Sequence, residues 1–341
     1  MGLEQQGSIL VTGGAGFIGS WLIHELNNRG IDQIVVADFL GHDEKWRNLV
    51  PLAFADFVDA GDLLELLGSG RLGKFDLVLH MGACSSTTER DAAYLMRNNY
   101  DFTRRLAEWS IGNGARFVYA SSAATYGDGT AGMDDSSDLS YIRRLRPLNM
   151  YGYSKHMFDL YAARNGLLKR CVGIKYFNVF GPNEQHKGDM RSLVSKAYAQ
   201  VVNTGVIRLF RSYREDYRDG EQKRDFIYVK DAVAMTLHLA ATEQAGLFNI
   251  GAGRAETWLD LAHAVFGAMG REPRIEFIDM PEEMRTTYQY LTLANITRLR
   301  TSGYKDSVTS LASAVHDYVT GYLATDTTET ISPTMETRQG T

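Results

Sequence analysis

The sequence predicts an α/β protein, with a doubly wound parallel sheet followed by a smaller mixed α/β C-terminal domain. Short β-branched runs alternate with helical stretches, the first run ends in a glycine-rich turn, and the pattern becomes irregular after residue 178. Strands that alternate with helices form parallel sheets covered on both faces. At 341 residues the chain is long enough for a large domain and a smaller companion.

The elements follow one another in a regular order through the first half of the chain. Apolar and β-branched runs predict strands at residues 8–12, 34–37, 77–80, 117–120 and 172–176. Apolar residues at helical spacing predict helices at residues 17–28, 92–111 and 151–167. Beyond the Gly-Pro break we expect a helix at 190–202, an exposed loop at 213–222, and short strands at 226–229 and 247–250.

The composition excludes several classes of function. A net charge of −5 gives no signature of nucleic-acid binding. No apolar run approaches the roughly 20 residues that a membrane span requires, and the first residues lack the apolar core of a secretory signal. Cys84 and Cys171 match no metal-ligand spacing and are interpreted as reduced thiols. We therefore expect a cytoplasmic protein without a metal site.

The stretch "VTGGAGFIGS" indicates a dinucleotide site. It places Gly13, Gly16 and Gly19 between a strand and a helix, where the backbone can approach a pyrophosphate at the helix N-terminus. Asp38 ends the second predicted strand, where a ribose hydroxyl would lie. A structural turn without a nucleotide is the alternative.

A dinucleotide site at this position predicts how the chain is divided into domains. Residues 1–178 become a Rossmann-type dinucleotide-binding domain, to which residues 224–252 return. Residues 179–223 and 253–323 then form a substrate-binding domain. Residues 324–341 are polar, and we expect them to be disordered.

The residues near Asp38 leave the choice of cofactor open. A carboxylate there favours NAD, because it repels a 2′-phosphate. Lys45 and Arg47 follow in "DFLGHDEKWRNL", and either can neutralise such a phosphate, although solvated charges explain them equally well. NADP and NAD both remain possible at this point.

Two motifs supply groups for proton transfer. "YGYSK" places Tyr151 and Lys155 four residues apart, on one face of a helix. A nearby ammonium favours the phenolate and brings a phenol closer to the range of a base. "YASSAATYG" ends the preceding strand and offers Ser121, Ser122 and Thr125 to bind the alcohol being oxidised.

Together the glycine loop, "SSAATYG" and "YGYSK" resemble the extended short-chain dehydrogenase/reductase family, most members of which act on nucleotide sugars. The resemblance implies a catalytic triad of Ser122, Tyr151 and Lys155. Dehydratases of this family usually carry Asp-Glu after the catalytic hydroxyl, and here Ala123 and Ala124 stand there. Dehydration is therefore not expected, whereas oxidation and epimerisation remain.

Epimerisation requires a second acid/base group, and "FGPNEQHKGDM" offers Lys187, although a loop lysine is commonly a solvated charge. The motifs "GACSSTTE", "MRNNY", "PLNMYGYSK", "YFNVFGP", "HKG", "KRDFIYV" and "FNIGAGRAE" are similar to the branch of this family that epimerises ADP-heptose. This resemblance covers residues 8–322. It implies transient oxidation at C6 with tightly bound NADP, a role in lipopolysaccharide core synthesis, and a homo-oligomer, with a pentamer as the implied size.

The same resemblance implies a set of site residues, with Tyr151 and Lys187 as the two acid/base groups. The cofactor is expected to be bound by Gly13, Gly16, Phe17, Ile18, Gly19, Asp38, Phe39, Lys45, Met81, Gly82, Ala83, Cys84, Ser85, Asn98, Tyr151, Lys155, Val179 and Lys187. The ADP-heptose is expected to contact Ser122, Asn178, Asp189, Lys196, Phe210, Arg211, Ser212, Tyr213, Arg224 and Tyr288.

Four positions depart from that branch and leave individual contacts open. Phe39 and Met81 stand where polar residues are usual, Asp189 replaces a small hydroxyl, and Lys196 replaces a histidine. One alternative function is another nucleotide-sugar epimerase or reductase, such as a UDP-hexose 4-epimerase. The other is a catalytically silent dinucleotide-binding regulator, against which the intact triad argues.

The hydroxyl-rich stretch "HMGACSSTTERD", residues 80–91, follows a predicted parallel strand, and ligands bind at the carboxyl ends of such strands. Gly82 and Ala83 allow the chain to pass close to the cofactor. The hydroxyls from Ser85 onward are expected to face the phosphates and the heptose. Cys84 is interpreted as a small packing residue.

Overall fold

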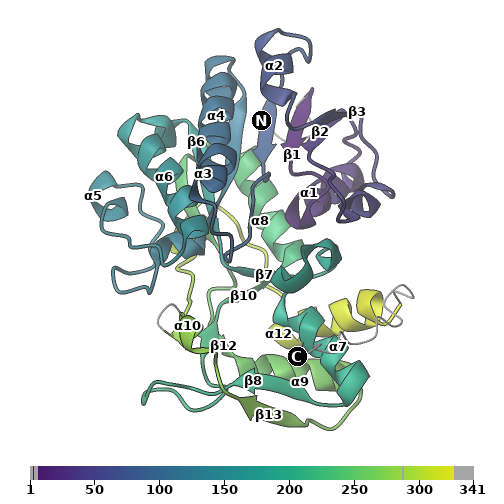
Figure 1. Cartoon of the computed structure of the whole chain (residues 1–341). Helices are drawn as coiled ribbons and strands as arrows, with labels where there is room; N and C mark the ends of the chain where they lie inside the picture. Colours follow the sequence, from purple (N-terminus) through teal and green to yellow (C-terminus); the bar gives the residue numbers. More distant parts are fainter. Residues whose placement is uncertain (1–2, 4–6, 286–287, 326–341) are drawn as a thin grey trace, which may run out of the picture.

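Seven parallel strands form the main sheet, in the order β11-β6-β5-β4-β1-β2-β3 (Figure 1). The structure, a computed structural model, describes residues 3, 7–285 and 288–325. The sheet confirms the predicted α/β class, and each strand predicted for it is present. Its strands are β1 (Ile9–Thr12), β2 (Ile34–Asp38), β3 (Asp56–Asp59), β4 (Leu77–His80), β5 (Arg116–Ser122), β6 (Cys171–Tyr176) and β11 (Gly246–Ile250).

Both faces of the sheet are covered by helices, as a doubly wound fold requires. Side chains alternate along a strand, so Ile9 and Val11 join the core beneath α1 and α8. Leu10, between them, joins a second core with side chains of α2, α4 and α6. These helices are α1 (Phe17–Asn28), α2 (Leu63–Gly68), α4 (Phe102–Gly112), α6 (Met150–Arg164) and α8 (Val229–Ala241).

The structure refines the predicted helices and adds a strand and a helix, β3 and α2, between β2 and β4. The helix predicted at 92–111 consists of α3 (Ala92–Leu95), a π-helical segment and α4. The helices predicted at 151–167 and 190–202 are α6 and α7 (Leu193–Thr204). The sequence analysis missed β3 and α2, because "DFVD" is short, begins and ends in aspartate, and shows little apolar alternation.

Three two-stranded sheets lie outside the main sheet (Figure 1). The strand predicted at 226–229 is β10, and it pairs with β7 rather than with the main sheet, whereas β11 pairs with β6. The pairs are β7 (Asn178–Phe180) with β10 (Phe226–Tyr228), β8 (Ile207–Phe210) with β13 (Ile275–Ile278), and β9 (Lys223–Arg224) with β12 (Glu256–Thr257).

The C-terminal helices α7, α9 and α12 gather beside β8 and β13, below the main sheet in Figure 1. Half of the loop predicted to be exposed at 213–222 is exposed, whereas Gly220 and Gln222 are buried. Of the tail predicted to be disordered, residues 326–341 lie outside the described residues. The boundaries between the two predicted domains stay a prediction. The remaining helices are α5 (Leu139–Ile142), α9 (Trp258–Ala268), α10 (Glu282–Arg285), α11 (Thr297–Thr301) and α12 (Leu311–Tyr318).

None of the helices in the described part of the chain is both long and apolar enough to cross a membrane.

His80 joins the ends of two neighbouring strands to a covering helix. Its Nδ1 lies 2.6 Å from Thr12 Oγ1 on β1, and its Nε2 lies 2.8 Å from Thr103 Oγ1 on α4. Thr12 Oγ1 also accepts a hydrogen bond from the N–H of Gly82 at 3.2 Å. Burial, with a contribution from the Lys155 charge, lowers the pKa of His80 to about 3, so the ring is neutral.

The neutral state of His80 makes the stability of the fold depend on pH. A folded pKa of about 3, against an ordinary value of 6.5, adds stability that is complete above pH 6.5 and is lost as the pH falls towards 3. Between pH 7.5 and 5.5 we expect the free energy of unfolding to fall by about 1.4 kcal/mol from this group alone. A His80→Gln variant should lack this component, which urea unfolding at both pH values will show. If the free energy of unfolding falls equally in the wild type and in His80→Gln between these pH values, the prediction is wrong.

Candidate active site

The glycine loop between β1 and α1 is held by close backbone contacts. Gly13 has a φ of +68°, and a Cβ there would lie 2.5 Å from the backbone nitrogen of Gly82. A Cβ on Gly19 would lie 2.1 Å from the carbonyl oxygen of Gly13. Gly16 caps α1 without any side-chain hydrogen bond, and the first turn of α1 has no acidic residue. The N–H groups of that turn are therefore free of side-chain acceptors and favour an anion.

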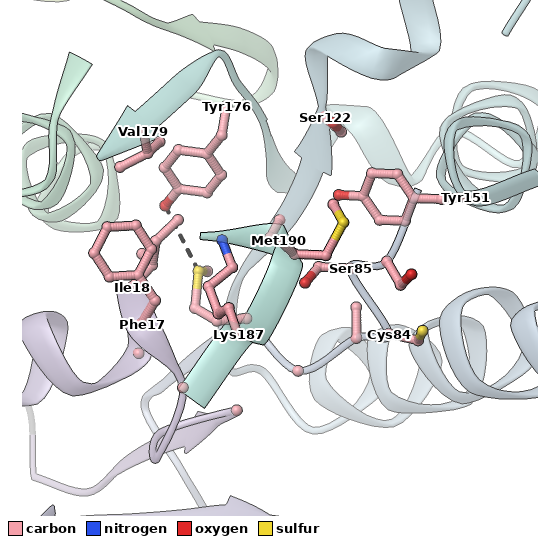
Figure 2. Close-up of a pocket in the computed structure, with 18 of the residues that line it drawn as sticks. Phe17, Ile18, Cys84, Ser85, Ser122, Tyr151, Tyr176, Val179, Lys187 and Met190 are labelled. Carbon is pink, nitrogen blue, oxygen red and sulfur yellow. Dashed lines mark hydrogen bonds between the residues drawn. The ribbon is translucent and has the colours of Figure 1, made fainter. Parts of the chain in front are cut away.

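A cavity of about 460 Å³ lies over this loop, between the carboxyl ends of the main-sheet strands and the segment after β7 (Figure 2). Every predicted cofactor residue lines it except Phe39 and Asn98, which line an adjoining cavity of about 240 Å³. Both cavities include Gly13, Asp38 and Lys45. The sequence analysis did not select the lining residues Asp43, Ala120, Tyr176, Phe177, His186 and Met190.

The carboxylate of Asp38 is fully engaged by neighbouring groups. Its Oδ2 accepts a hydrogen bond from the N–H of Ala15 at 2.9 Å, and its Oδ1 accepts one from the N–H of Phe39 at 2.8 Å. Lys45 Nζ lies 3.0 Å from the same Oδ1. Asp38 thus fixes the glycine loop, and its charge is balanced at the cavity wall.

Arg47, the second cation considered near Asp38, is turned towards other groups. Its Nε lies 2.7 Å from Glu44 Oε2, and its guanidinium lies 5.4 Å from the centre of the Trp46 ring. Between the two candidate cations, Lys45 is the one that faces the cavity over the glycine loop.

The N-terminus of α6 packs tightly against the turn that follows β5. Asn149 caps the helix by accepting the N–H of Gly152 at 2.8 Å. A Cβ on Gly152 would lie 2.7 Å from the carbonyl oxygen of Ala124, so only glycine permits this approach. The approach brings Tyr151 within hydrogen-bonding reach of Ser122.

Tyr151 and Lys155 occupy a desolvated region of the cavity. Burial raises the pKa of Tyr151, and a hydrogen bond with Ser122 acts in the opposite direction. Lys155 Nζ donates to the carbonyl oxygen of Ala120 at 2.7 Å, and burial lowers its pKa to about 8. Without a further positive charge Tyr151 is therefore a neutral phenol that can donate a proton.

Lys187 reaches the same cavity from the opposite wall. Figure 2 shows Tyr151 and Lys187 pointing into the cavity from two sides, with the side chain of Met190 between them in this view. Lys187 Nζ lies 5.2 Å from the centre of the Phe17 ring. Burial lowers the pKa of Lys187, and the charge of Glu184 partly offsets that effect. A desolvated lysine with a lowered pKa can exchange a proton closer to neutral pH.

A second cavity, of about 390 Å³, adjoins the first and includes two of the predicted substrate residues, Asn178 and Lys196. It also includes Lys187 and Met190, so the two cavities share a wall. Trp258 lines this second cavity and was not predicted. An aromatic residue after "GRAET" gives no signal in the sequence that separates a site residue from a core residue.

Arg224 and Tyr288 adjoin this cavity through Trp258. The guanidinium of Arg224 lies 5.5 Å from the centre of the Trp258 ring and 5.1 Å from that of Tyr288. Trp258 Nε1 donates to the hydroxyl of Tyr288 at 2.8 Å. Arg224 is buried, and burial lowers its pKa. A desolvated cation held by two aromatic rings suits an anionic ligand.

Of the other predicted substrate residues, Ser122 lines the cavity over the glycine loop. Five of them line neither cavity: Asp189, Phe210, Arg211, Ser212 and Tyr213. Arg211 pairs with Asp219 at 3.2 Å, and the N–H of Ser212 donates to Asp219 at 2.7 Å. Tyr213 donates to Asp279 at 3.0 Å. Phe210 ends β8. Asp189 is exposed, and its carbonyl oxygen accepts from Lys196 at 2.5 Å.

The hydroxyl-rich stretch after β4 is divided between the cavity and its rim. Ser85 and Ser86 line the cavity over the glycine loop. Thr87 donates to the sulfur of Met190 at 3.9 Å. The side-chain amide of Asn99 holds the backbone of Cys84, with both hydrogen bonds at 2.9 Å. Cys84 itself lines the cavity, so its small side chain forms part of the wall.

Comparison with known proteins identifies the family. Residues 9–251 match the NAD dependent epimerase/dehydratase family. Over 317 residues, which are 92% of this chain and 98% of the relative, the chain is 53% identical to an ADP-L-glycero-D-manno-heptose-6-epimerase of Nitratidesulfovibrio vulgaris. It is 42% identical over 325 residues to the enzyme of that name from Fusobacterium nucleatum, covering 93% of this chain and 98% of the relative.

Solved structures agree with these relatives. A crystal structure of Helicobacter pylori ADP-L-glycero-D-manno-heptose-6-epimerase superposes with a TM-score of 0.76 at 27% identity, covering 92% of this chain and 94% of that one. Thermus thermophilus UDP-glucose 4-epimerase in complex with NAD gives a TM-score of 0.71 at 25% identity, covering 92% and 98%. With its parallel sheet, glycine loop and matching relatives, the chain belongs to the NAD dependent epimerase/dehydratase family.

Proposed function

We propose that the chain interconverts ADP-D-glycero-D-manno-heptose and ADP-L-glycero-D-manno-heptose, by transient oxidation at C6 and reduction from the other face. One observation carries this proposal: Tyr151 and Lys187 face a single cavity from opposite walls. Relatives named for this reaction are 42% and 53% identical over more than nine-tenths of the chain. The product belongs to lipopolysaccharide core synthesis.

The glycine loop fits a nicotinamide dinucleotide. Gly13 and Gly19 leave room that a Cβ would fill, and the first turn of α1 offers uncapped N–H groups to a pyrophosphate. The nicotinamide, when bound, supplies a reversible hydride acceptor. Lys155 and Ser85, which line the same cavity, hold the nicotinamide end, and Phe39 and Asn98 hold the adenosine end.

The two acid/base groups account for the inversion. Ser122 would bind the C6 hydroxyl. Tyr151, made a phenolate by the added positive charge of an oxidised dinucleotide beside the Lys155 ammonium, would take the hydroxyl proton, while the C6 hydrogen leaves as the hydride that this dinucleotide accepts, so that a ketone remains. When the ketone turns to present its other face, its oxygen points away from Tyr151. Lys187, on the opposite wall, would then give a proton to that oxygen as the same hydride returns to the other face of C6. The substrate loses one proton and regains one, and the enzyme is reset when Tyr151 releases a proton to solvent and Lys187 takes one up.

We assign the substrate to the second cavity and its neighbours. Asn178, Lys196 and the shared residue Lys187 line that cavity, and the heptose lies there in this assignment. Arg224, clamped by Trp258 and Tyr288, suits the pyrophosphate of ADP. Residues 1–178 with 224–252 then bind the dinucleotide, and residues 179–223 with 253–323 bind the substrate. A cytoplasmic location and a pentameric homo-oligomer complete the proposal.

NADP is the dinucleotide that we propose. The ammonium of Lys45 lies 3.0 Å from Asp38 and balances the carboxylate that would otherwise repel a 2′-phosphate. Lys45 also lines both cofactor cavities. NAD is the alternative: Lys45 is the only lysine or arginine among the described residues that line the smaller cavity, and Asp38 offsets its charge.

Replacing either acid/base group should stop epimerisation while the protein stays folded. We expect Tyr151→Phe and Lys187→Met each to reduce kcat by about 10²- to 10⁴-fold, because each removes one proton transfer. The assay incubates each variant with ADP-D-glycero-D-manno-heptose and follows the stereochemistry at C6 by NMR.

The exposed lysine Lys169, replaced by Met, serves as the matched control and should retain activity. Full activity in Lys187→Met would refute the two-base assignment. Turnover of UDP-hexoses with none of ADP-heptose would indicate another nucleotide-sugar epimerase. Bound cofactor without turnover of any nucleotide sugar would indicate a regulator.

Lys45 should set the preference for the phosphorylated cofactor. In Lys45→Ala, Asp38 is unpaired, and we expect affinity for NADP to fall about 10- to 100-fold while affinity for NAD changes by less than about threefold. Calorimetric titration of the cofactor-free protein with each dinucleotide measures the dissociation constants of NADP and NAD. Arg47→Ala, at the cation that faces Glu44, is the control. Equal weakening of both dinucleotides in Lys45→Ala would show that Lys45 does not read the phosphate.

A further inference from the structure

A buried ion pair lies directly beneath the catalytic residues. Lys175 on β6 and Asp159 on α6 approach to 2.7 Å between Nζ and Oδ2, and both side chains are 0% exposed. Removing two charges from water is costly, and an apolar pair of similar volume is often no less stable. The pair is therefore poorly explained by stability alone.

Asp159 is connected to the strand that carries the catalytic serine. Its Oδ2 accepts from the hydroxyl of Ser121 at 2.8 Å, and its Oδ1 accepts from the hydroxyl of Tyr119 at 2.9 Å. Both donors lie on β5, which ends at Ser122. With Lys175 added, the carboxylate holds three partners and joins β5, β6 and α6.

Lys175 is connected to the turn that follows that strand. Its Nζ donates to Thr125 Oγ1 at 2.5 Å, and Thr125 Oγ1 donates to the carbonyl oxygen of Ser122 at 2.7 Å. The ammonium also lies 4.7 Å from the centre of the Tyr126 ring. A continuous chain of contacts therefore runs from the ion pair to the backbone of Ser122.

Asp159 also acts on the catalytic lysine along the helix. Tyr151, Lys155 and Asp159 follow one another at four-residue steps, which places them on one face of α6. The charge of Asp159 raises the pKa of Lys155 against the larger effect of burial. This carboxylate therefore favours the ammonium form of Lys155.

Other ionisable groups also face these residues. Cys84, after β4, acts on Lys155 in the same direction as Asp159, and His80 on β4 is neutral. Around Asp159 lie His156 on the same helix, Cys171 and Lys175 on β6, and Tyr119 and Tyr126 at β5 and its turn.

We propose that Asp159 and Lys175 are positioning residues for the epimerisation: the pair fixes Ser122 through Thr125 and keeps Lys155 as an ammonium. The inference rests on the proposed function, because its readout is turnover of ADP-heptose. Neither residue lines the cavity over the glycine loop or the cavity beside it, so substrate affinity should depend little on the pair.

The pH dependence of turnover separates positioning from stability. In Asp159→Asn, Lys155 loses its main anionic neighbour, deprotonates at a lower pH, and leaves the ammonium form sooner as the pH rises. We expect the basic limb of kcat/KM to move to lower pH, and kcat at pH 7.5 to fall about 10- to 100-fold with KM changed less than about threefold. Reactions quenched at timed intervals between pH 6 and 9 and analysed by NMR give kcat and KM at each pH.

Thr125 gives a second test, because Thr125→Val keeps the ion pair and the side-chain volume. It removes only the hydroxyl between Lys175 and Ser122. We expect kcat to fall about 10-fold with the basic limb unmoved, and Thr125→Ser to restore turnover. Asp317→Asn is the control, because it breaks the Lys230–Asp317 pair, also 2.7 Å long, which is partly exposed and outside the site.

The outcomes distinguish this inference from the proposed function. Lack of wild-type turnover on ADP-heptose rejects the proposed function. If the wild type is active, an unmoved basic limb in an active Asp159→Asn variant rejects the positioning role. If that variant does not fold, Thr125→Val decides, and wild-type kcat in Thr125→Val overturns the proposal. If Asp317→Asn lowers kcat as much as Asp159→Asn does, the Asp159–Lys175 pair has only a structural role.

Discussion

The close approach of two backbone turns is the constraint on which the site depends. Gly13, after β1, lies so near Gly82, after β4, that a Cβ would come within 2.5 Å of the neighbouring nitrogen. This contact brings the first turn of α1 against the hydroxyl-rich stretch and forms the floor of the cavity over the glycine loop. His80 and Thr12, hydrogen-bonded one residue before each turn, fix the same two strand ends. Because both turns start from adjacent parallel strands, the cavity is a consequence of the sheet order.

The site holds three cations that are shielded from water. Lys155, Lys187 and Arg224 are all desolvated, and burial lowers the pKa of each. Three desolvated cations, two of them buried, are unfavourable by themselves, and phosphates or the carboxylates Asp159 and Glu184 offset that cost. The site is therefore arranged to be stable when anionic ligands fill it, as a dinucleotide and a nucleotide sugar do.

The sequence predicted those parts of the fold and the site that depend on local residue patterns. β-branched runs gave the strands of the main sheet, and glycine spacing gave the phosphate loop, since only glycine permits those backbone contacts. The partner of β10 could not be predicted, because periodicity identifies a strand and says nothing of its neighbour. Trp258 was missed for a similar reason, since its role comes from the ring of Tyr288 and the guanidinium of Arg224. Residues 210–213 were expected at the substrate through resemblance alone, and there the chain turns to its own acidic residues.

The loop Gln185–Met190 has a consequence for how this enzyme class can diverge. Tyr151 is carried by a helix of the rigid scaffold, whereas Lys187 is carried by a short segment with an unusual backbone at Gly188, outside the main sheet. If the two residues carry the proposed proton transfers, the two halves of the reaction depend on separate pieces of the chain. A change confined to this loop would leave oxidation possible while the ketone waits without its second proton donor. Under the proposed mechanism, the residue that this one loop carries separates an isomerase from an oxidoreductase that stops at the ketone.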